Sequence, residues 1–524
     1  MSVAPTLADR SSAPPARRET AAALLLLGAA FVVHLWLAAT MPLAPDETYY
    51  WEWSRRPALG YYDQGPMIAW WIRASTALLG ATPLGVRLGV VVAALATQAL
   101  AYLLGRDLFG PRAGLLGLVF LTVTPLSQVG ATIATYDPLQ VLFWVAATWL
   151  AARAAIGGRR WAWIGMGVAV GLGTLSKHTM VLFAPCLLLF LALPAQRTWL
   201  RRPEPYLAVL AALAVFAPNL WWQAQHGWMT FEHLVVLTAK GADQSALRRF
   251  GDFVGSQAAL VSPPLFFGFL AALRHAARVR RDPGGDRWWL LFCLSLPVLL
   301  FFTAMTLKAK AQANWAAAAW VTPAVAYGAW LAAPGRRVSR AARAWTWAAG
   351  LFALGLSVLL AVPGTRLLLP VRFPARWDQG NKLYGGPEVA AAADREAAAM
   401  RAEGSRHVVP GAATYDIASR LAFYMRGQPR TRCLFLNTRL NSYVAWNDEA
   451  GLRPGDDAIL VDGKGPDDPE LPAFAADFDR VVPVPKPVEV WRRGLYDSPV
   501  RVYFLYRCYG YRQNPAAEHP AEGK

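Results

Sequence analysis

Long apolar runs separated by short polar segments follow one another from Ala21 to Val362. Most are roughly 16–21 residues long, close to the ~20 residues that a helix needs to cross the hydrocarbon core of a membrane. The pattern predicts a polytopic α-helical membrane protein with about 11 transmembrane helices. The predicted spans are 21–40, 84–104, 113–129, 138–156, 161–176, 179–194, 206–222, 256–273, 289–306, 314–332 and 344–362.

Three segments outside these runs have other patterns. Residues 1–20 are polar and rich in Pro and Ala, which favours a disordered tail. The segment 41–83 starts too polar to cross a membrane but contains the helical run Met67–Leu79. It predicts two short helices that lie along the membrane surface. The segment 223–255 is longer than a simple connection requires and contains two histidines.

The pattern changes after Val362, where charged residues, Gly and Pro return to the frequency of soluble proteins. The alternating runs Asp457–Val461 and Val500–Tyr506 predict strands, and Glu388–Glu403 predicts a helix. We therefore expect a small C-terminal α/β domain. The predicted divisions are a disordered tail over 1–20, a transmembrane domain over 21–363 that includes 41–83, an α/β domain over 364–513 and a disordered tail over 514–524.

Composition and charge agree with a membrane protein. Hydrophobic residues make up 55% of the 524 residues and charged residues 16%, against about 25% charged in an average soluble protein. A net charge of +18 could indicate nucleic-acid binding, but the Arg residues lie in the N-terminal tail and in alternate short loops. That distribution is typical of cytoplasmic loops and argues against a nucleic-acid partner. It places the N-terminus in the cytoplasm, and an odd number of spans then places the C-terminal domain on the outer side.

Acidic residues at helix starts are the first candidates for chemistry. Asp46 and Glu47 follow the first predicted span, and Asp137 precedes the span 138–156 on the same side of the membrane. A carboxylate at such a place could act as a general base toward an acceptor hydroxyl or amine. The alternative is a structural role, because acidic side chains stabilise the first turn of a helix. The sequence leaves both roles open.

Basic residues on the outer side are a second group of candidates. Lys177 and His178 lie between two spans with almost no loop, and Lys308 and Lys310 precede Asn314 at another outer turn. Cations at these places oppose the positive-inside bias, which makes them candidates for binding an anion such as a lipid phosphate. The alternative is that their long side chains reach to lipid headgroups.

Two further sets of residues could have a binding or structural role. Tyr61, Tyr62 and Asp63 could line a polar cavity, or form an interfacial aromatic belt and a turn. Cys433 and Cys508 lie in the polar C-terminal region and could form a disulfide in an oxidising compartment. The sequence has no Walker loop, no Gly-x-Gly-x-x-Gly after a strand and no Cys-x-x-Cys. Nucleotide chemistry therefore has no evident site.

The motifs, taken in order, resemble one known family. The run Asp46–Ser54, followed by Gly60–Asp63 and Pro66, resembles the first outer loop of GT-C glycosyltransferases. The closest resemblance is to bacterial members of the protein O-mannosyltransferase and lipid A aminoarabinose transferase superfamily. The run Gly171–Thr179 is similar to their Gly-Leu-Gly…Ser-Lys-Tyr-Thr. Further similar motifs are Val86–Leu88, Leu108–Pro111, Tyr136–Pro138, Gln223–Trp228, Asn314–Trp315 and Leu421–Tyr424.

The resemblance implies an integral membrane glycosyltransferase of the bacterial inner membrane. Such an enzyme moves a sugar from a polyprenyl-phosphate-linked donor to a lipid, polysaccharide or protein acceptor at the outer face, with an inverting mechanism. The resemblance also implies roles for individual residues. These are Asp46 as the catalytic carboxylate with Glu47 beside it, Asp137 as a second acid of the cavity, Lys177 and His178 near the donor phosphate, and Lys308 with Asn314 on the other wall.

The chain also departs from the family pattern. Many relatives have Asp-His-Pro-Pro where this chain has Asp63-Gln64-Gly65-Pro66, so a role for that His in metal or substrate binding does not carry over. Some GT-C members use a divalent cation, but the sequence offers no evident ligand set. Two other functions remain as alternatives. A transporter or flippase for lipid-linked sugars leaves the first outer loop and the α/β domain without a role, and a membrane-anchored signalling or assembly protein does not need so many helices.

Overall fold

The computed structural model describes residues 15–239, 244–335, 339–368, 374–375, 378–434, 440–467, 471, 475–492 and 494–512. The chain forms two compact units. We call the first the membrane unit. It contains the chain up to Ala39, Ala58–Trp71 and Arg87–Val362. The second, the α/β unit, contains Thr40–Pro57, Ile72–Val86 and the chain from Pro363 onward.

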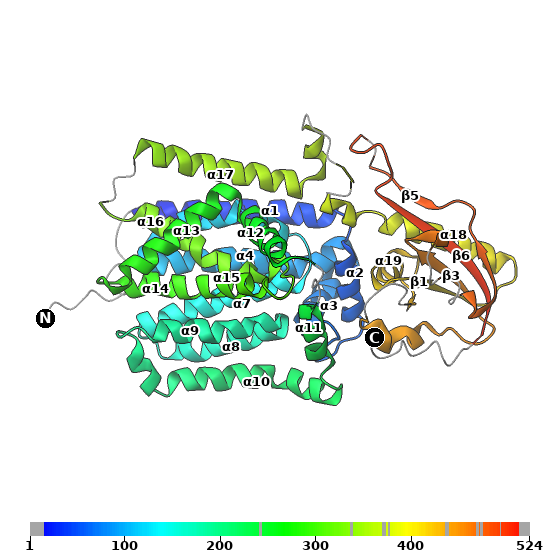
Figure 1. Cartoon of the computed structure of the whole chain (residues 1–524), viewed down its shortest axis with the longest axis horizontal. Coiled ribbons are helices and arrows are strands. Elements are labelled where there is room, and N and C mark those ends of the chain that lie inside the picture. The colour runs from blue at the N-terminus through cyan, green and yellow to red at the C-terminus, as the bar shows by residue number, and fades with distance from the viewer. Residues whose placement is uncertain are drawn as a thin grey trace. The chain divides into compact units, whose positions relative to one another are not determined.

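The membrane unit is a helical bundle whose long helices lie side by side in roughly the same direction (Figure 1). Among the described residues, six helical segments are long and apolar enough to cross a membrane, or seven with a bent pair, and four further apolar helices are shorter. The helices up to residue 361 are α1 (Pro15–Thr40), α2 (Pro45–Ser54), α3 (Met67–Leu79), α4 (Pro83–Phe109), α5 (Pro111–Thr122), α6 (Pro125–Gly130), α7 (Tyr136–Ala151), α8 (Trp161–Ser176), α9 (Phe183–Leu191), α10 (Glu204–Gln225), α11 (Met229–Ala239), α12 (Ala246–Val261), α13 (Pro263–Arg278), α14 (Gly285–Cys293), α15 (Leu296–Met305), α16 (Val321–Ala332) and α17 (Arg340–Ala361).

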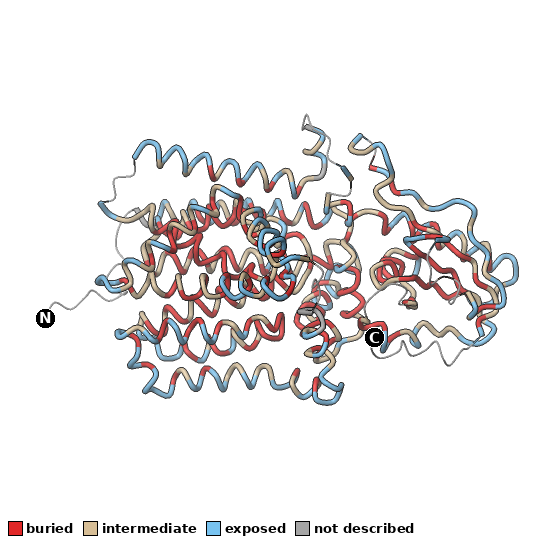
Figure 2. The backbone as a smooth tube through the Cα atoms, in the orientation of Figure 1, coloured by how far each residue is buried: buried red, intermediate tan, exposed pale blue. Residues whose placement is uncertain are grey.

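Apolar surface on the outside of this bundle agrees with a lipid environment. Long stretches of α10 and α17 are exposed (Figure 2), although both helices are apolar enough to span a membrane.

Inside the bundle, glycines allow close helix contacts. A Cβ atom on Gly167 of α8 would lie 2.0 Å from the Ala208 carbonyl oxygen of α10, and one on Gly328 of α16 would lie 2.3 Å from the Gly117 nitrogen of α5. The chain is therefore a multi-pass membrane protein.

Two predicted boundaries are wrong in the membrane unit. The first helix already starts at Pro15, so residues 15–20 are helical and not part of a disordered tail. The predicted span 256–273 is interrupted, because α12 and α13 meet at an angle of 96°. Ser262 at the junction has φ of +71°, and the next residue is a proline without a backbone N–H, which ends α12. The predicted tail over 514–524 lies outside the described residues.

The α/β unit is built on a mixed sheet. Among the described residues the strand order is β2-β1-β3-β6-β4, with β5 also paired to β6. Pairs β1–β2 and β1–β3 are parallel, and β6 is antiparallel to each strand it pairs with. Helices α18 and α19 contact each other and the sheet. The elements are α18 (Gly386–Ala402), β1 (Val408–Ala412), α19 (Tyr415–Tyr424), β2 (Arg432–Cys433), α20 (Tyr443–Trp446), β3 (Asp457–Asp462), β4 (Phe478–Pro483), β5 (Val488–Val490) and β6 (Arg501–Tyr511).

Helix α2 belongs to the α/β unit, whereas the sequence assigned it to the transmembrane domain. Every residue from Glu47 to Ser54 is buried, and α2 packs against α19 inside the α/β unit. The segments Thr40–Pro57 and Ile72–Val86 belong to this unit as well. The reason is physical: a helix rich in Tyr and Trp suits a protein core as well as a membrane interface.

The predicted disulfide between Cys433 and Cys508 is also wrong. Cys433 lies on β2 and Cys508 on β6, and β1 and β3 run between these strands. Three strand spacings amount to about 14 Å, whereas disulfide-linked Cα atoms lie within about 7 Å of each other. Both cysteines are buried thiols.

Candidate functional site

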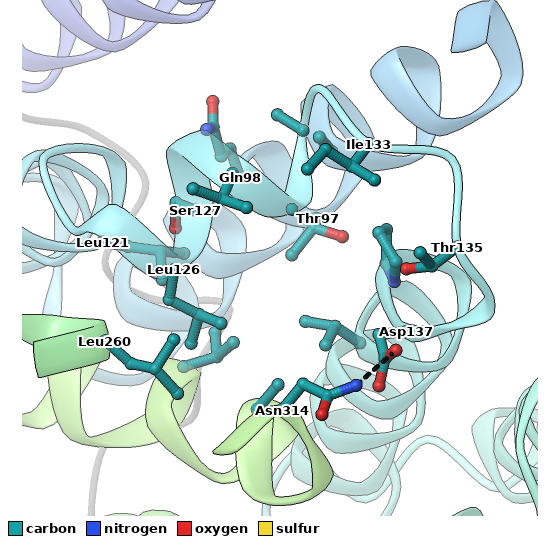
Figure 3. Close-up of a pocket in the computed structure, with 18 residues that line it drawn as sticks. Thr97, Gln98, Leu121, Leu126, Ser127, Ile133, Thr135, Asp137, Leu260 and Asn314 are labelled. Atoms are coloured by element: carbon teal, nitrogen blue, oxygen red, sulfur yellow. Dashed lines mark hydrogen bonds between the residues drawn. The ribbon is translucent and has the colours of Figure 1, made fainter. Parts of the chain in front are cut away.

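A buried polar cluster at the start of α7 is the centre of the candidate site. Asp137 lies in the first turn of α7 and is 9% exposed. Its Oδ1 accepts a hydrogen bond from Lys177 Nζ at 2.6 Å, and its Oδ2 accepts one from Asn314 Nδ2 at 2.9 Å (Figure 3). These residues come from three separate parts of the bundle. The structure therefore unites two cavity residues and one cation that the sequence analysis had singled out separately.

Lys177 owes its position to a break in the helix. Its backbone is extended (φ −153°, ψ 128°) and ends α8, and the 3₁₀ turn His178–Leu182 follows. The side chain is buried, with Nζ 5.4 Å from the centre of the Tyr136 ring. A buried ammonium group needs a carboxylate or an anionic ligand to offset its lost hydration. Because the Lys177 head is enclosed, it does not reach out to lipid headgroups.

Two members of the cluster, Asp137 and Asn314, line a cavity of about 250 Å³, whereas Lys177 is not among its described lining residues. Its walls are mostly apolar, and Leu121, Leu126, Ile133 and Leu260 contribute to them (Figure 3). The remaining polar lining comes from Thr97, Gln98, Ser127 and Thr135. A largely apolar lining with a few polar side chains fits an apolar ligand that carries a polar head, because the apolar part is buried against hydrocarbon and the head meets a polar side chain.

His178 contacts the loop that follows α2 rather than the Asp137 carboxylate. Its Nδ1 lies 2.9 Å from Gln64 Oε1, which is the position where relatives often have His. Gly65 makes this approach possible, since a Cβ atom there would lie 2.1 Å from the backbone oxygen of Leu175. The sequence analysis named His178 but missed Gln64, because contacts between a loop and a helix end leave no periodic signal.

Tyr61, Tyr62 and Asp63 fix the same loop from its other side. The carbonyl oxygen of Tyr61 accepts a hydrogen bond from the Thr230 hydroxyl at 2.7 Å. Asp63 Oδ1 lies 3.5 Å from His233 Nε2, and the Tyr62 and His233 rings are 4.9 Å apart. Asp63 is buried, so a charged or hydrogen-bonded partner is expected beside it. His233 supplies that partner, which the sequence analysis did not foresee.

Asp46 and Glu47 differ sharply in the structure. Both lie in the first turn of α2, in the α/β unit. Glu47 is fully buried, and its Oε2 accepts a hydrogen bond from the Ala44 backbone nitrogen at 2.7 Å. Glu47 therefore fills the structural role at a helix N-terminus. Asp46 is exposed.

Lys308 and Lys310 are exposed and, within the described chain, neither is among the residues that line the cavity. Nearby, the buried Arg249 donates hydrogen bonds to the carbonyl oxygens of Thr306 and Leu307, both at 2.8 Å. Arg249 thus provides hydrogen-bond donors for carbonyl oxygens at the C-terminal end of α15, a role that the sequence analysis missed. In the part of the chain that the structure describes, no group of three or more His, Cys, Asp or Glu side chains could hold a metal ion.

Comparisons with known proteins agree with the resemblance noted in the sequence. Residues 63–222 match the model of the dolichyl-phosphate-mannose-protein mannosyltransferase family. The chain is 34% identical over 284 residues to a lipid A galacturonosyltransferase of Rhizobium johnstonii, covering 53% of the chain and 58% of that protein. It is 31% identical to an undecaprenyl phosphate-alpha-4-amino-4-deoxy-L-arabinose arabinosyl transferase of Edwardsiella ictaluri, covering 50% and 51%. The chain thus spans little more than half the length of these relatives.

Solved structures extend the likeness to almost the whole chain. ArnT from Cupriavidus metallidurans bound to undecaprenyl phosphate has a TM-score of 0.64 at 16% identity, over 92% of this chain and 97% of that one. The archaeal oligosaccharyltransferase AglB from Archaeoglobus fulgidus has a TM-score of 0.50 at 11% identity, over 87% and 71%. The resemblance to the protein mannosyltransferase and aminoarabinose transferase superfamily is therefore supported, and the chain shares the fold of these solved structures.

Proposed function

We propose that the chain is an integral membrane glycosyltransferase that moves a sugar from a polyprenyl-phosphate-linked donor to an acceptor at the outer face of the bacterial inner membrane. The observation that carries this proposal is the buried Asp137–Lys177 pair, whose carboxylate belongs to a residue that lines a largely apolar cavity. The relatives add support, since their names include two glycosyl transferases and an undecaprenyl phosphate donor. The acceptor is a lipid, a polysaccharide or a protein.

Lys177 is proposed to bind the donor phosphate. In the structure its charge is offset by Asp137 at 2.6 Å, and the neighbouring cavity is apolar enough to hold part of a polyprenyl chain. A phosphate at this place would share the ammonium group with the carboxylate, and the His178 ring, whose Nδ1 donates to Gln64 Oε1, would lie near it. Tyr61, Tyr62 and Asp63 are not among the described residues that line this cavity, and we propose that their loop contacts the sugar.

Asp46 is proposed as the general base. It would take the proton of the acceptor hydroxyl or amine as that group attacks the anomeric carbon of the donor sugar. The new bond forms on the face opposite the leaving group, and the bond from the anomeric carbon to the phosphate oxygen breaks, so the configuration inverts. Polyprenyl phosphate leaves with the bonding electrons, and Lys177 stabilises the charge that develops on it.

The topology is part of the same proposal. About 11 spans would place the N-terminus in the cytoplasm and the α/β unit in the periplasm. Glu47 would support Asp46 through the α2 cap, and Asp137 would act through Lys177. The exposed Lys308 and Lys310 would attract the anionic donor from the outer surface. No nucleic-acid partner is expected.

A transfer assay on the purified full-length protein in lipid vesicles tests the proposal. A panel of radiolabelled polyprenyl-phosphate sugars is offered with envelope lipids, glycans and proteins as acceptors. We expect label from one donor to appear on an acceptor, and Asp46→Asn to abolish this transfer while Asp467→Asn, an exposed acid of the same unit, preserves it. Donors that cross the bilayer with the sugar still attached would make the chain a transporter.

A further inference from the structure

Helix α2, which carries Asp46, is part of the core of the α/β unit. The Tyr49 ring lies 4.8 Å from the Tyr415 ring and 6.3 Å from the Tyr443 ring, measured between ring centres. The Trp51 ring meets Phe423 edge to face at 5.0 Å. These partners lie more than 360 residues further along the chain. The C-terminal domain therefore surrounds a helix that belongs to the first outer loop.

Glu52 is the electrostatic centre of this contact. Its side chain is fully buried and accepts hydrogen bonds from Arg55 Nη1 at 2.6 Å and Arg56 Nη1 at 2.7 Å. Arg55 Nη2 also donates to the Gln428 carbonyl oxygen at 2.9 Å, and Arg56 Nε donates to Glu449 Oε2 at 2.7 Å. One buried carboxylate thus orients two guanidinium groups, and each of these reaches a different segment of the C-terminal domain.

Stacking restricts both guanidinium groups further. Arg55 lies over the Trp51 ring at 4.7 Å, and Arg56 lies over the Trp446 ring at 4.4 Å. A planar guanidinium group that is stacked and also hydrogen-bonded has few alternative orientations. Because Glu52 offsets the charge of both groups, its loss would leave two partly buried cations close together with Glu449 as their acidic partner in this cluster.

The start of α2 is fixed by hydrogen bonds to the same domain. The Leu43 backbone nitrogen donates to the Tyr424 hydroxyl at 2.8 Å, and the Thr48 and Ser419 hydroxyl oxygens are 2.9 Å apart. With Glu52 near its other end, the helix is anchored along its whole length. Asp46 stands exposed in the first turn of this fixed helix.

We propose that the C-terminal α/β domain is a positioning device for Asp46, and that Glu52 is its main positioning residue. This inference rests on the proposed function, because it assumes that Asp46 takes part in the transfer. A displacement of about 1 Å in a catalytic group can lower the rate about 100-fold. The domain therefore acts on turnover through the placement of α2, and it needs no substrate contact of its own to do so.

The first experiment compares Glu52→Gln with Glu489→Gln, an exposed acid of the same unit, in the full-length protein. We expect Glu52→Gln to lower kcat about 10- to 100-fold with donor KM within about twofold. Glu489→Gln should keep both values. Tyr424→Phe removes one hydrogen bond at the other end of α2 and should lower kcat by a smaller factor. Normal kcat in both Glu52→Gln and Tyr424→Phe would overturn the proposal.

The second experiment restores the position of α2 without the charge. Thr48→Cys and Ser419→Cys are introduced into Glu52→Gln, at two hydroxyl groups already in contact. Oxidation should restore most of kcat and reduction should remove it again, which a general loss of folding would not reproduce. A disulfide verified by mass spectrometry that restores no activity would overturn the positioning role. Full activity of Asp46→Asn would instead overturn the proposed function beneath it.

Discussion

Lys177→Met tests whether charge holds the cluster at the start of α7 together. Lys177 is 2% exposed and Asp137 is 9% exposed, so water cannot readily replace a lost partner. The substitution keeps much of the side-chain volume and removes the ammonium group. It leaves the Asp137 carboxylate with the Asn314 amide as its remaining hydrogen-bond donor in this cluster. The membrane unit should become less stable for that reason.

The expected loss follows from the distance within the pair. Two unit charges 2.6 Å apart attract each other by about 6 kcal/mol at an effective dielectric constant of about 20. Desolvation of both groups offsets much of this attraction, yet removal of one partner alone costs about 3–5 kcal/mol, because the other charge stays buried. Asp137→Asn combined with Lys177→Met removes both charges. That double variant should lose much less stability than Lys177→Met.

The assay is thermal unfolding of the full-length protein in lipid nanodiscs, followed by Trp fluorescence. Lys464→Met, an exposed Lys of the α/β unit, is the matched control and should unfold like the natural protein. Undecaprenyl phosphate should stabilise the natural protein, since a ligand that binds the folded state raises its stability, and it should not stabilise the double variant. Equal stability of Lys177→Met and the double variant would refute the argument from charge.

Three further predictions concern packing and ionisation. Gly65→Ala should lower turnover strongly, because its Cβ would lie 2.1 Å from the Leu175 oxygen; normal kinetics would contradict the close approach. Burial alone raises the pKa of Asp378, but the hydrogen bond from Tyr496 and a neighbouring guanidinium outweigh it, so the pKa lies below its ordinary value. The ionised Asp378 carboxylate therefore stabilises the folded state above about pH 3.9, and this contribution is lost as the pH falls through the lowered pKa. Proteolysis of the α/β unit should rise in acid, and it should rise less steeply in Asp378→Asn. Burial raises the pKa of the Cys508 thiol, so maleimide should label it at neutral pH only after unfolding.

The sequence predicted the components of the membrane site but not their pairing. Asp137, Lys177 and Asn314 were each singled out, the first as an acid of the cavity and the second as a ligand for phosphate. Their contacts join residues 40 and 177 positions apart, and no local pattern reports such distances. The sequence predicts that Lys177 binds an anionic ligand. In the structure its ammonium group already pairs with the Asp137 carboxylate.

Helix α2 shows a different limit of sequence-based prediction. The sequence predicts a short helix in this segment and places it along the membrane surface. The residues that decide its environment, such as Tyr424 and Trp446, come from the far end of the chain. A single amphipathic or aromatic segment does not specify whether lipid or a distant domain covers it. The bend after Val261 did have a signal in the sequence, the two prolines after Ser262, but the apolar run on both sides of them was predicted as one span.

Asp137 and Glu52 are two buried carboxylates that pair with basic side chains, but their surroundings suit different roles. Each offsets cations that would be costly to bury alone. Asp137 and its partner Asn314 line a cavity, so this pair lies next to space that a ligand can occupy. Glu52 is fully enclosed, and its two guanidinium groups are stacked on Trp rings, so its contacts have no room to exchange. The first arrangement suits ligand binding, and the second suits a fixed support for the helix that carries Asp46.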